Sequence, residues 1–186
     1  TPNADTAYKV EFYYQKDDQS SYTLDHTDNR TGTTDTTASV TAADKAAKEN
    51  GKYVFDASAA NVESGNIAAD GSLVLTAYFA RNTYKVTFRN GGEAVSEQTL
   101  RWGEALTAPV LTKAGYDLSW SPELPLTMPQ QDVTYTAVWT AQSNIGYAVE
   151  HYQQNVTGSG YTLADTDRLT GTTDAEVTAA AKGYEH

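Results

Sequence analysis

Apolar and polar residues alternate with a period of two along much of the chain, which is the pattern of strands that bury one face. In residues 8–15, for example, Tyr8, Val10, Phe12 and Tyr14 alternate with more polar neighbours. Clusters of Gly, Asn, Asp and Ser separate such runs and mark turns. The pattern predicts strands at residues 8–15, 22–30, 53–55, 73–79, 84–88 and 133–139, with another that runs through Trp120.

One segment favours helix instead. Residues 42–48 are rich in alanine and lysine, and Asn50 and Gly51 follow as a pair that often ends a helix. These signals predict a short helix of about two turns. The predicted fold class is therefore mainly β with a small helical part (α+β).

The chain also repeats itself. Residues 8–35 return as residues 147–174, and a gapless alignment leaves 16 of the 28 positions identical. A chain that reuses one unit is typically an array that reaches, displays or binds multivalently. The repeat therefore argues against an enzyme built around a single site.

Substitutions between the copies indicate an irregular first strand. Phe12 and Tyr14 become His151 and Gln153, whereas Tyr13 keeps its identity although its parity places it on the polar face. A β-bulge, or a strand covered on both faces, explains such a change of face.

The spacing of the copies sets the predicted domain organisation. The offset of 139 residues leaves room for a different unit, so we predict modules at residues 1–82, 83–141 and 142–186. Compared with residues 53–80, the third module lacks the later strands and is truncated. A partial module leaves strand edges uncovered. We therefore expect residues 147–186 to become ordered by pairing with another chain or with added neighbours.

Two family resemblances follow from local motifs. Residues 8–81, through the segments at 8–14, 32–34, 40–42 and 70–75, resemble a mucin-binding-protein (MucBP-type) repeat. Residues 84–139 resemble an internalin-type B-repeat through 84–88, the Gly91-Gly92 pair, Trp120 and the run 127–139. That pattern usually has Gly where this chain has Ser119, and Tyr where it has Trp102.

The resemblances imply a fold, a location and a role. Both families belong to exported, wall-attached bacterial surface proteins whose repeats are small β-grasp or ubiquitin-like modules. The expected architecture is thus a tandem, elongated array of such modules. The expected location is extracellular, at the cell surface or cell wall.

Composition narrows the partners further. The 186 residues carry a formal net charge of −11, and no basic patch interrupts the acidity. Nucleic acid and an anionic membrane surface are therefore excluded as expected partners, and no apolar run is long enough for membrane insertion. The absence of cysteine removes disulfides, thiol catalysis and thiolate zinc sites.

No residue pattern predicts catalysis, a metal site or a cofactor. The histidines His26, His151 and His186 lack ligand spacing, and no Gly-x-Ser-x-Gly elbow is present. Asp17, Asp18 and neighbouring carboxylates are interpreted as a solvated loop edge, with weak calcium binding as the alternative. The sequence therefore predicts a protein that is not an enzyme.

Aromatic side chains are the remaining candidates for recognition. Thirteen tyrosines, three tryptophans and four phenylalanines supply core volume, and tyrosine and tryptophan also form platforms on which sugars stack. We assign Trp120 and Trp139 to the core. The candidate ligand-binding residues are Tyr14, Tyr22, Trp102 and Tyr161.

Two functional hypotheses remain. The first is a non-catalytic repeat region of a secreted or wall-anchored surface protein, with an adhesion or stalk role and weak multivalent binding to a glycan or host glycoprotein. The second is a set of accessory domains of a secreted carbohydrate-active or other extracellular enzyme whose catalytic domain lies outside this fragment.

Overall fold

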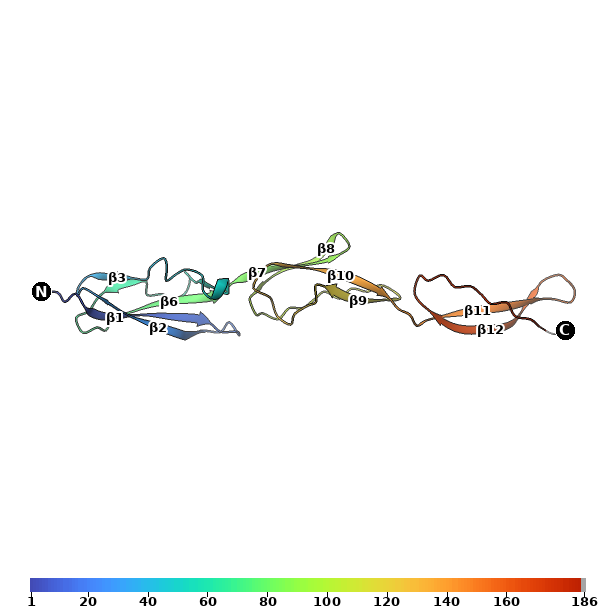
Figure 1. Ribbon diagram of the computed structural model, residues 1–186, viewed down its shortest axis with the longest axis horizontal. Helices are drawn as coiled ribbons and strands as arrows, with labels where there is room; N and C mark the ends of the chain where they lie inside the picture. Colours follow the sequence, from blue (N-terminus) through green and yellow to red (C-terminus); the bar gives the residue numbers. More distant parts are fainter. Residues whose placement is uncertain (185–186) are drawn as a thin grey trace. The chain divides into compact units, whose positions relative to one another are not determined.

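Strands dominate the fold of the computed structural model, which describes residues 1–184 (Figure 1). The only helical element among these residues is a short 3-10 helix, η1 (Glu49–Gly51). The mainly-β prediction is confirmed. The chain packs as two compact units, described here separately: the first contains residues 1–87, 94–108 and 125–134, and the second contains 88–93, 109–124 and the described residues from 135 onward.

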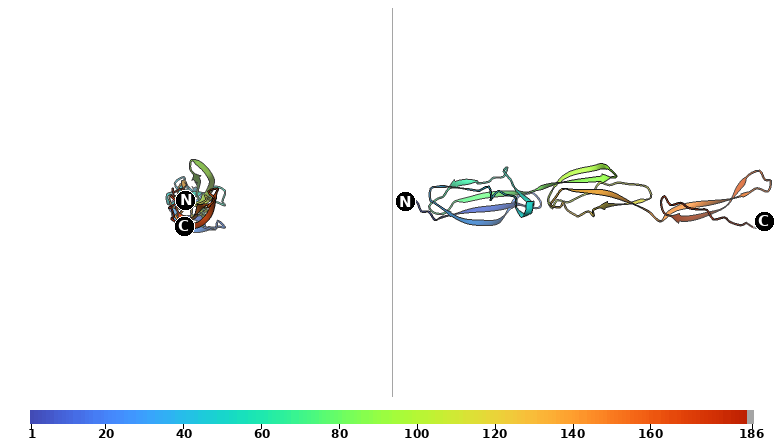
Figure 2. Two further views of the ribbon diagram at one scale, coloured as in Figure 1. Left: turned by 90° about the vertical axis from the view of Figure 1, so that its right-hand side faces the viewer. Right: turned by 45° about the horizontal axis from the view of Figure 1, so that its top comes forward.

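The first unit holds a mixed four-stranded sheet. Its strand order is β2-β1-β6-β4, with β1 (Thr6–Gln15), β2 (Tyr22–Gly32), β4 (Tyr53–Phe55) and β6 (Val74–Arg81). β1 runs antiparallel to β2 and parallel to β6, while β4 and β6 are antiparallel. The views of Figure 2 show β1, β2 and β6 side by side. β3 (Thr37–Ser39) and β5 (Ser64–Asn66) form a separate two-stranded sheet.

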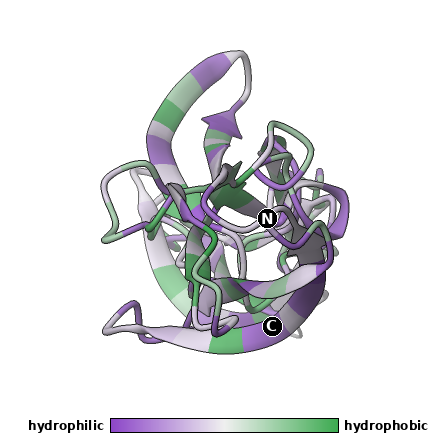
Figure 3. Cartoon of the chain, turned by 90° about the vertical axis from the view of Figure 1, so that its left-hand side faces the viewer, coloured by the Kyte–Doolittle hydropathy of each residue, from purple (hydrophilic) through white to green (hydrophobic). Residues whose placement is uncertain are grey.

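Alternation along the central strands builds the core of this unit. Val10 and Phe12 from β1 pack against one face of β6, which contributes Leu75, Ala77 and Phe79. The segments in and just after β3 and β5 complete the cluster with Ala38, Val40 and Ile67. Figure 3, which views the chain end-on, shows hydrophobic and hydrophilic bands on the strand ribbons. The period-two pattern thus correctly predicted which face is buried.

A second sheet has the strand order β8-β7-β10-β9. Its members are β7 (Thr83–Asn90), β8 (Glu93–Arg101), β9 (Tyr116–Ser121) and β10 (Val133–Ala141). Trp120 and Trp139, both assigned to the core, are each only half-buried. Trp120 packs edge-on against the buried Phe88 with ring centroids 5.0 Å apart, and the Trp139 indole N–H donates to Asn90 Oδ1 at 3.0 Å.

The predicted helix at residues 42–48 is wrong, because a single turn forms there. The Thr41 hydroxyl accepts from the Asp44 N–H at 3.1 Å, the Asp44 carboxylate accepts from the Thr41 N–H at 2.8 Å, and Lys45 N–H closes one turn on Thr41 O at 3.1 Å. This is the reciprocal arrangement that starts a helix. Arg30 holds the Asp44 side chain in a two-pronged ion pair at 2.7 and 2.9 Å.

The predicted C-cap pair has a different role. Lys48 and Tyr53 form an antiparallel bridge, with the Lys48 N–H donating to Tyr53 O at 2.9 Å. Asn50 and Gly51 lie inside this tight reversal with φ values of 56° and 96°. They therefore turn the chain toward β4 instead of ending a helix.

The predicted irregularity at Tyr13 is confirmed. The register of β1 and β2 shifts between Phe12 and Tyr13, and the extra residue of the bulge is Asp25 on β2. Tyr13 is also covered on the outer face of the sheet, where it stacks on Tyr78 with centroids 4.8 Å apart. Because the extra residue lies on β2, the alternation of β1 continues through Tyr13, and the cover by Tyr78 explains why this tyrosine is retained.

The second repeat copy forms the hairpin of β11 (Ile145–Gln154) and β12 (Tyr161–Gly171). Its register shifts between His151 and Tyr152, at the position equivalent to the first bulge, and the extra residue is Ala164. Within the described chain, β11 pairs with β12 alone, and residues 172–184 contain no strand. The module boundaries proposed at residues 82 and 141 stay predictions.

Candidate functional site

An open groove of about 570 Å³ lies at the end of the β1–β2 hairpin in the first unit. We call it the acidic groove, because carboxylates border it on several sides. Its lining consists of Tyr14, Gln15, Lys16, Asp17, Asp18, Thr23, Leu24, Asp25, Glu49 and Tyr53. Strand β1 and the loop after it supply residues 14–18, and β2 supplies residues 23–25. Glu49 comes from η1, and Tyr53 is the first residue of β4.

A row of aromatic rings connects two of the predicted ligand residues. Tyr14 stacks on Tyr53 with centroids 4.5 Å apart, and Tyr53 meets Trp102 edge-on at 5.8 Å. The Lys52 ammonium group lies 4.6 Å from the centroid of the Trp102 ring, within the range of a cation–π contact. Tyr14 and Trp102 thus belong to one aromatic cluster, although only Tyr14 lines the groove.

The groove presents neutral phenols beside ionised carboxylates. Burial raises the pKa of Tyr14, and the charges of Asp25 and Glu49 raise it further. Burial likewise raises the pKa of Tyr53, with Glu49 and Asp17 adding to the effect. A ligand would meet phenol donors, carboxylate acceptors and ring faces, a set that suits sugar hydroxyl groups and repels anions.

Arg81, at the end of β6, fixes the loop that borders the groove. Its side chain is 2% exposed, and its guanidinium donates to Asp17 O at 2.6 Å and to Trp102 O at 2.9 Å. Its own N–H donates to Gln15 Oε1 at 3.1 Å. The sequence analysis missed Arg81, because a polar residue at a strand end gives no signal of such long-range contacts.

Tyr22 lies on the opposite face of the sheet from the core, away from the groove. Its ring meets Tyr78 edge-on at 5.1 Å, and its hydroxyl donates to Asp56. Burial and this hydrogen bond raise the pKa of Tyr22 to about 12. Tyr161, the equivalent residue of the second copy, is 69% exposed in the second unit. The structure therefore brings neither residue to the acidic groove.

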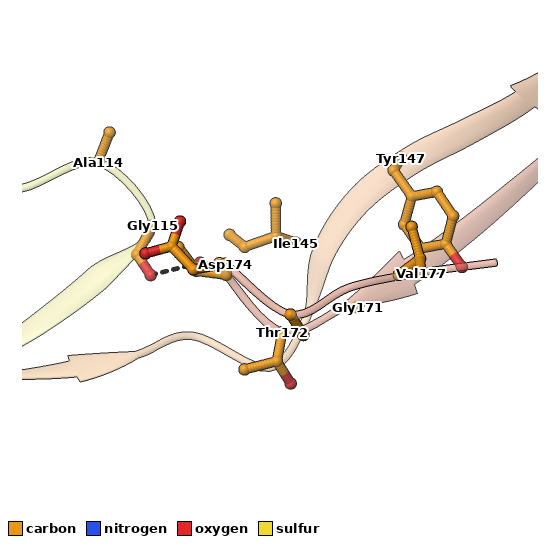
Figure 4. A pocket seen from close by; sticks show the side chains of 10 residues that line it. Ala114, Gly115, Ile145, Tyr147, Gly171, Thr172, Asp174 and Val177 are labelled. Atoms are coloured by element: carbon orange, nitrogen blue, oxygen red, sulfur yellow. Dashed lines mark hydrogen bonds between the residues drawn. The ribbon is translucent and has the colours of Figure 1, made fainter.

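A second, more apolar pocket of about 400 Å³ lies in the second unit (Figure 4). Ile145, Tyr147 and Val177 provide its apolar walls, and the other lining residues are Ala114, Gly115, Gly171, Thr172, Thr173, Asp174 and Ala175. The Thr173 hydroxyl donates to Gly115 O at 2.6 Å, and the Tyr116 hydroxyl donates to Asp174. The sequence analysis did not predict this pocket, although Ile145 in place of Thr6 was a visible change.

The histidines pair with carboxylates. His26 lies 2.6 Å from Asp25 and His151 lies 3.1 Å from Asp167, while His186 is outside the described residues. Among residues 1–184, no three histidine or carboxylate side chains gather closely enough to hold a metal ion. None of the helical structure described in that range is long and apolar enough to cross a membrane.

No family model matches the chain, and no curated protein matches it in sequence.

Proposed function

We propose that this chain is a non-catalytic repeat region of a secreted or wall-anchored bacterial surface protein, with an adhesion or stalk role. The observation that carries the proposal is the equivalence of the two hairpins, which share strand register and bulge position. Even side-chain details recur: the Tyr13 hydroxyl donates to Glu11 and the Tyr152 hydroxyl to Glu150, each at 2.6 Å. What the chain repeats is a scaffold, which is the hallmark of an array.

The proposed fold of the module is β-grasp, as the MucBP resemblance implies. The support is the first sheet, in which two parallel central strands, β1 and β6, have antiparallel outer neighbours, β2 and β4. The single turn at Thr41 takes the place of the expected helix between the second and later strands.

The proposed binding function rests on the acidic groove. Several groove residues differ between the copies: Tyr14, Asp17 and Asp25 stand opposite Gln153, Val156 and Ala164, whereas Gln15, Thr23 and Leu24 recur. The groove is open, so a single site would bind a glycan or glycoprotein weakly, and an array of several modules that carry this groove would raise the avidity by about 10²–10⁴. A net charge of −11 makes nucleic acid and anionic membrane surfaces poor partners.

The second copy supplies the matched variants that test this function. Tyr14→Gln and Asp25→Ala introduce residues that the same backbone already carries in β11 and β12. The experiment is a glycan and mucin binding screen on the whole chain displayed at high density. We expect binding that falls at least about tenfold in both variants, because the stacking ring or an acceptor is lost.

Tyr22→Phe is the control, since Tyr22 lies on the other face of the sheet and should leave glycan binding unchanged. Uniformly flat binding by the wild-type chain would contradict the recognition role and leave the stalk role. If Tyr14→Gln leaves glycan binding unchanged, the binding site lies outside the acidic groove.

A further inference from the structure

The first copy shows what normally covers the outer edge of its hairpin. β6 pairs in parallel with β1, in a register that sets Lys9 opposite Val74 and Tyr14 opposite Phe79. The Lys9 N–H donates to Leu73 O at 3.0 Å, so this N–H points toward β6 and away from β2. In the second copy, the described chain offers β11 no such neighbour. The edge of β11 therefore presents the unpaired counterparts of these donors.

Ile67, just after β5, fills a space that corresponds to the apolar pocket. It is 2% exposed, and a Cβ atom added to Gly32 would lie only 2.5 Å from its Cδ1 atom. It is held by hydrogen bonds from the Asp35 N–H to Ile67 O at 3.0 Å and from its own N–H to Thr36 O at 2.9 Å. Gly171 and Tyr147, the equivalents of Gly32 and Tyr8, line the pocket of the second copy together with Val177 (Figure 4).

The outer face of the second hairpin also lacks the cover that β6 gives the first hairpin. In the first copy, Tyr78 of β6 lies between Tyr13 and Tyr22, with centroid distances of 4.8 and 5.1 Å. The equivalent tyrosines of the second copy, Tyr152 and Tyr161, are 52% and 69% exposed. In the second copy, the β11 edge, the apolar pocket and the outer face of the hairpin are thus all uncovered. In the first copy, one continuous segment, residues 63–82, covers all three of the equivalent places.

We propose that the second copy binds a polypeptide segment with the sequence pattern of residues 63–82, taken up in parallel alongside β11. The repeat fixes the register: Ala148 lies opposite the position of Val74, and Gln153 opposite that of Phe79. The branched side chain at the fifth position of the segment, which is Ile67 in residues 63–82, enters the pocket beside Gly171. Backbone hydrogen bonds provide the affinity, and the pocket and the tyrosine pair provide the selectivity. This inference stands independently of the proposed glycan binding.

The test uses the whole isotope-labelled chain and a synthetic peptide of residues 63–82. We expect chemical-shift changes in β11, and exchange of the Ala148, Glu150 and Tyr152 amide protons that slows at least about tenfold. The first copy is an internal control, because its β1 edge is already occupied and should not respond. The Ala148→Pro variant removes one donor at the free edge while sparing those that face β12, and should weaken binding at least about tenfold.

Two altered peptides separate the parts of the site. Ile67→Asp in the peptide tests the apolar pocket, and Leu75→Asp tests the face that covers Val149, because Leu75 lies opposite Val10, the counterpart of Val149. Each should reduce binding at least about tenfold, because a carboxylate would be buried without a partner. Equal binding by both altered peptides and the unaltered one would overturn the proposal.

Other outcomes would overturn it as well. One is a β11 that does not respond to peptide, and another is an equal response of β1 and β11. A third is self-association of the chain that protects β11 when no peptide is present, measured by analytical ultracentrifugation with amide exchange. In that case a second copy of the chain would be the occupant.

Discussion

The two repeat copies share a hairpin but not a core. Sixteen of 28 aligned residues are identical, and the bulge occurs at the same place in both. Yet Val10 and Phe12 are 0% and 1% exposed, whereas their equivalents Val149 and His151 are only half-buried. The difference teaches that local sequence sets the register of the hairpin, while burial depends on strands from farther along the chain.

Turn residues illustrate the local part of this division. Asp35 and Asp174 adopt the left-handed conformation in both copies, with φ values of 63° and 59°. Gln19 and Gly158 do so as well, at 60° and 72°. Because the backbone shape is the same, Gly158 adopts without cost a conformation that Gln19 must be held in.

The largest expected contrast comes from the core position of β1 that lies opposite the bulge. Phe12→Ala should destabilise the first copy by about 3–5 kcal/mol, because it removes a buried ring that stacks on His26 and packs against Phe79. His151→Ala should cost the second copy less than about 1 kcal/mol. Residue-resolved urea unfolding followed by NMR checks both values, and equal losses would contradict the difference in burial.

Removing the Arg81 contacts should loosen one loop and spare its counterpart. Arg81→Met keeps the side-chain bulk but leaves the carbonyls of Asp17 and Trp102 without their donors, at a cost of about 1–3 kcal/mol. Amide exchange should accelerate at residues 16–21 and remain unchanged at residues 155–160. If both loops respond alike, Arg81 is not what fixes the border of the acidic groove.

The Arg30–Asp44 pair should give the first copy an acid sensitivity that the second lacks. The hydrogen bonds from Arg30, and next those from Thr41, hold the pKa of Asp44 well below its ordinary value of 3.8. The stabilisation is therefore complete above about pH 4 and is lost as the pH falls through the lower folded-state pKa.

Asp44→Asn should cost about 1–2 kcal/mol at pH 7 and flatten the acid branch of the stability curve of the first copy. The second copy has Leu169 in place of Arg30, so it cannot form this ion pair and serves as the control. Chemical denaturation at a series of pH values from 7 to 2 checks this. An unchanged acid branch in the variant would rule out Asp44 as its source.

The smallest expected contrast concerns two equivalent hydroxyl groups. Tyr22→Phe removes the hydrogen bond to Asp56 and should cost about 1 kcal/mol. Tyr161→Phe should cost close to nothing, since Tyr161 is 69% exposed. Thermal unfolding of the two variants side by side measures the difference, and a larger loss for Tyr161→Phe would reverse the assignment of the covered face.

Sequence periodicity was sufficient for most of the long strands and for the buried face of β1, because each depends on neighbouring residues, but it did not predict β3, β5 or β8. It failed at residues 42–48, where a single turn forms despite the helix propensity of the segment. It proposed Tyr14 and Trp102 separately, but not the Tyr53 ring that joins them. The roles of Arg81 and of the apolar pocket depend on contacts between distant segments, which no local pattern encodes.

Native-state hydrogen exchange of equivalent amides tests the central claim most directly. In the whole chain without added peptide, the Lys9, Glu11 and Tyr13 amides should be strongly protected, because β6 covers this edge of β1. The amides of Ala148, Glu150 and Tyr152 should exchange at least about a hundredfold faster. Equal protection of the two sets would contradict the account, because it would mean that the edge of β11 is already covered.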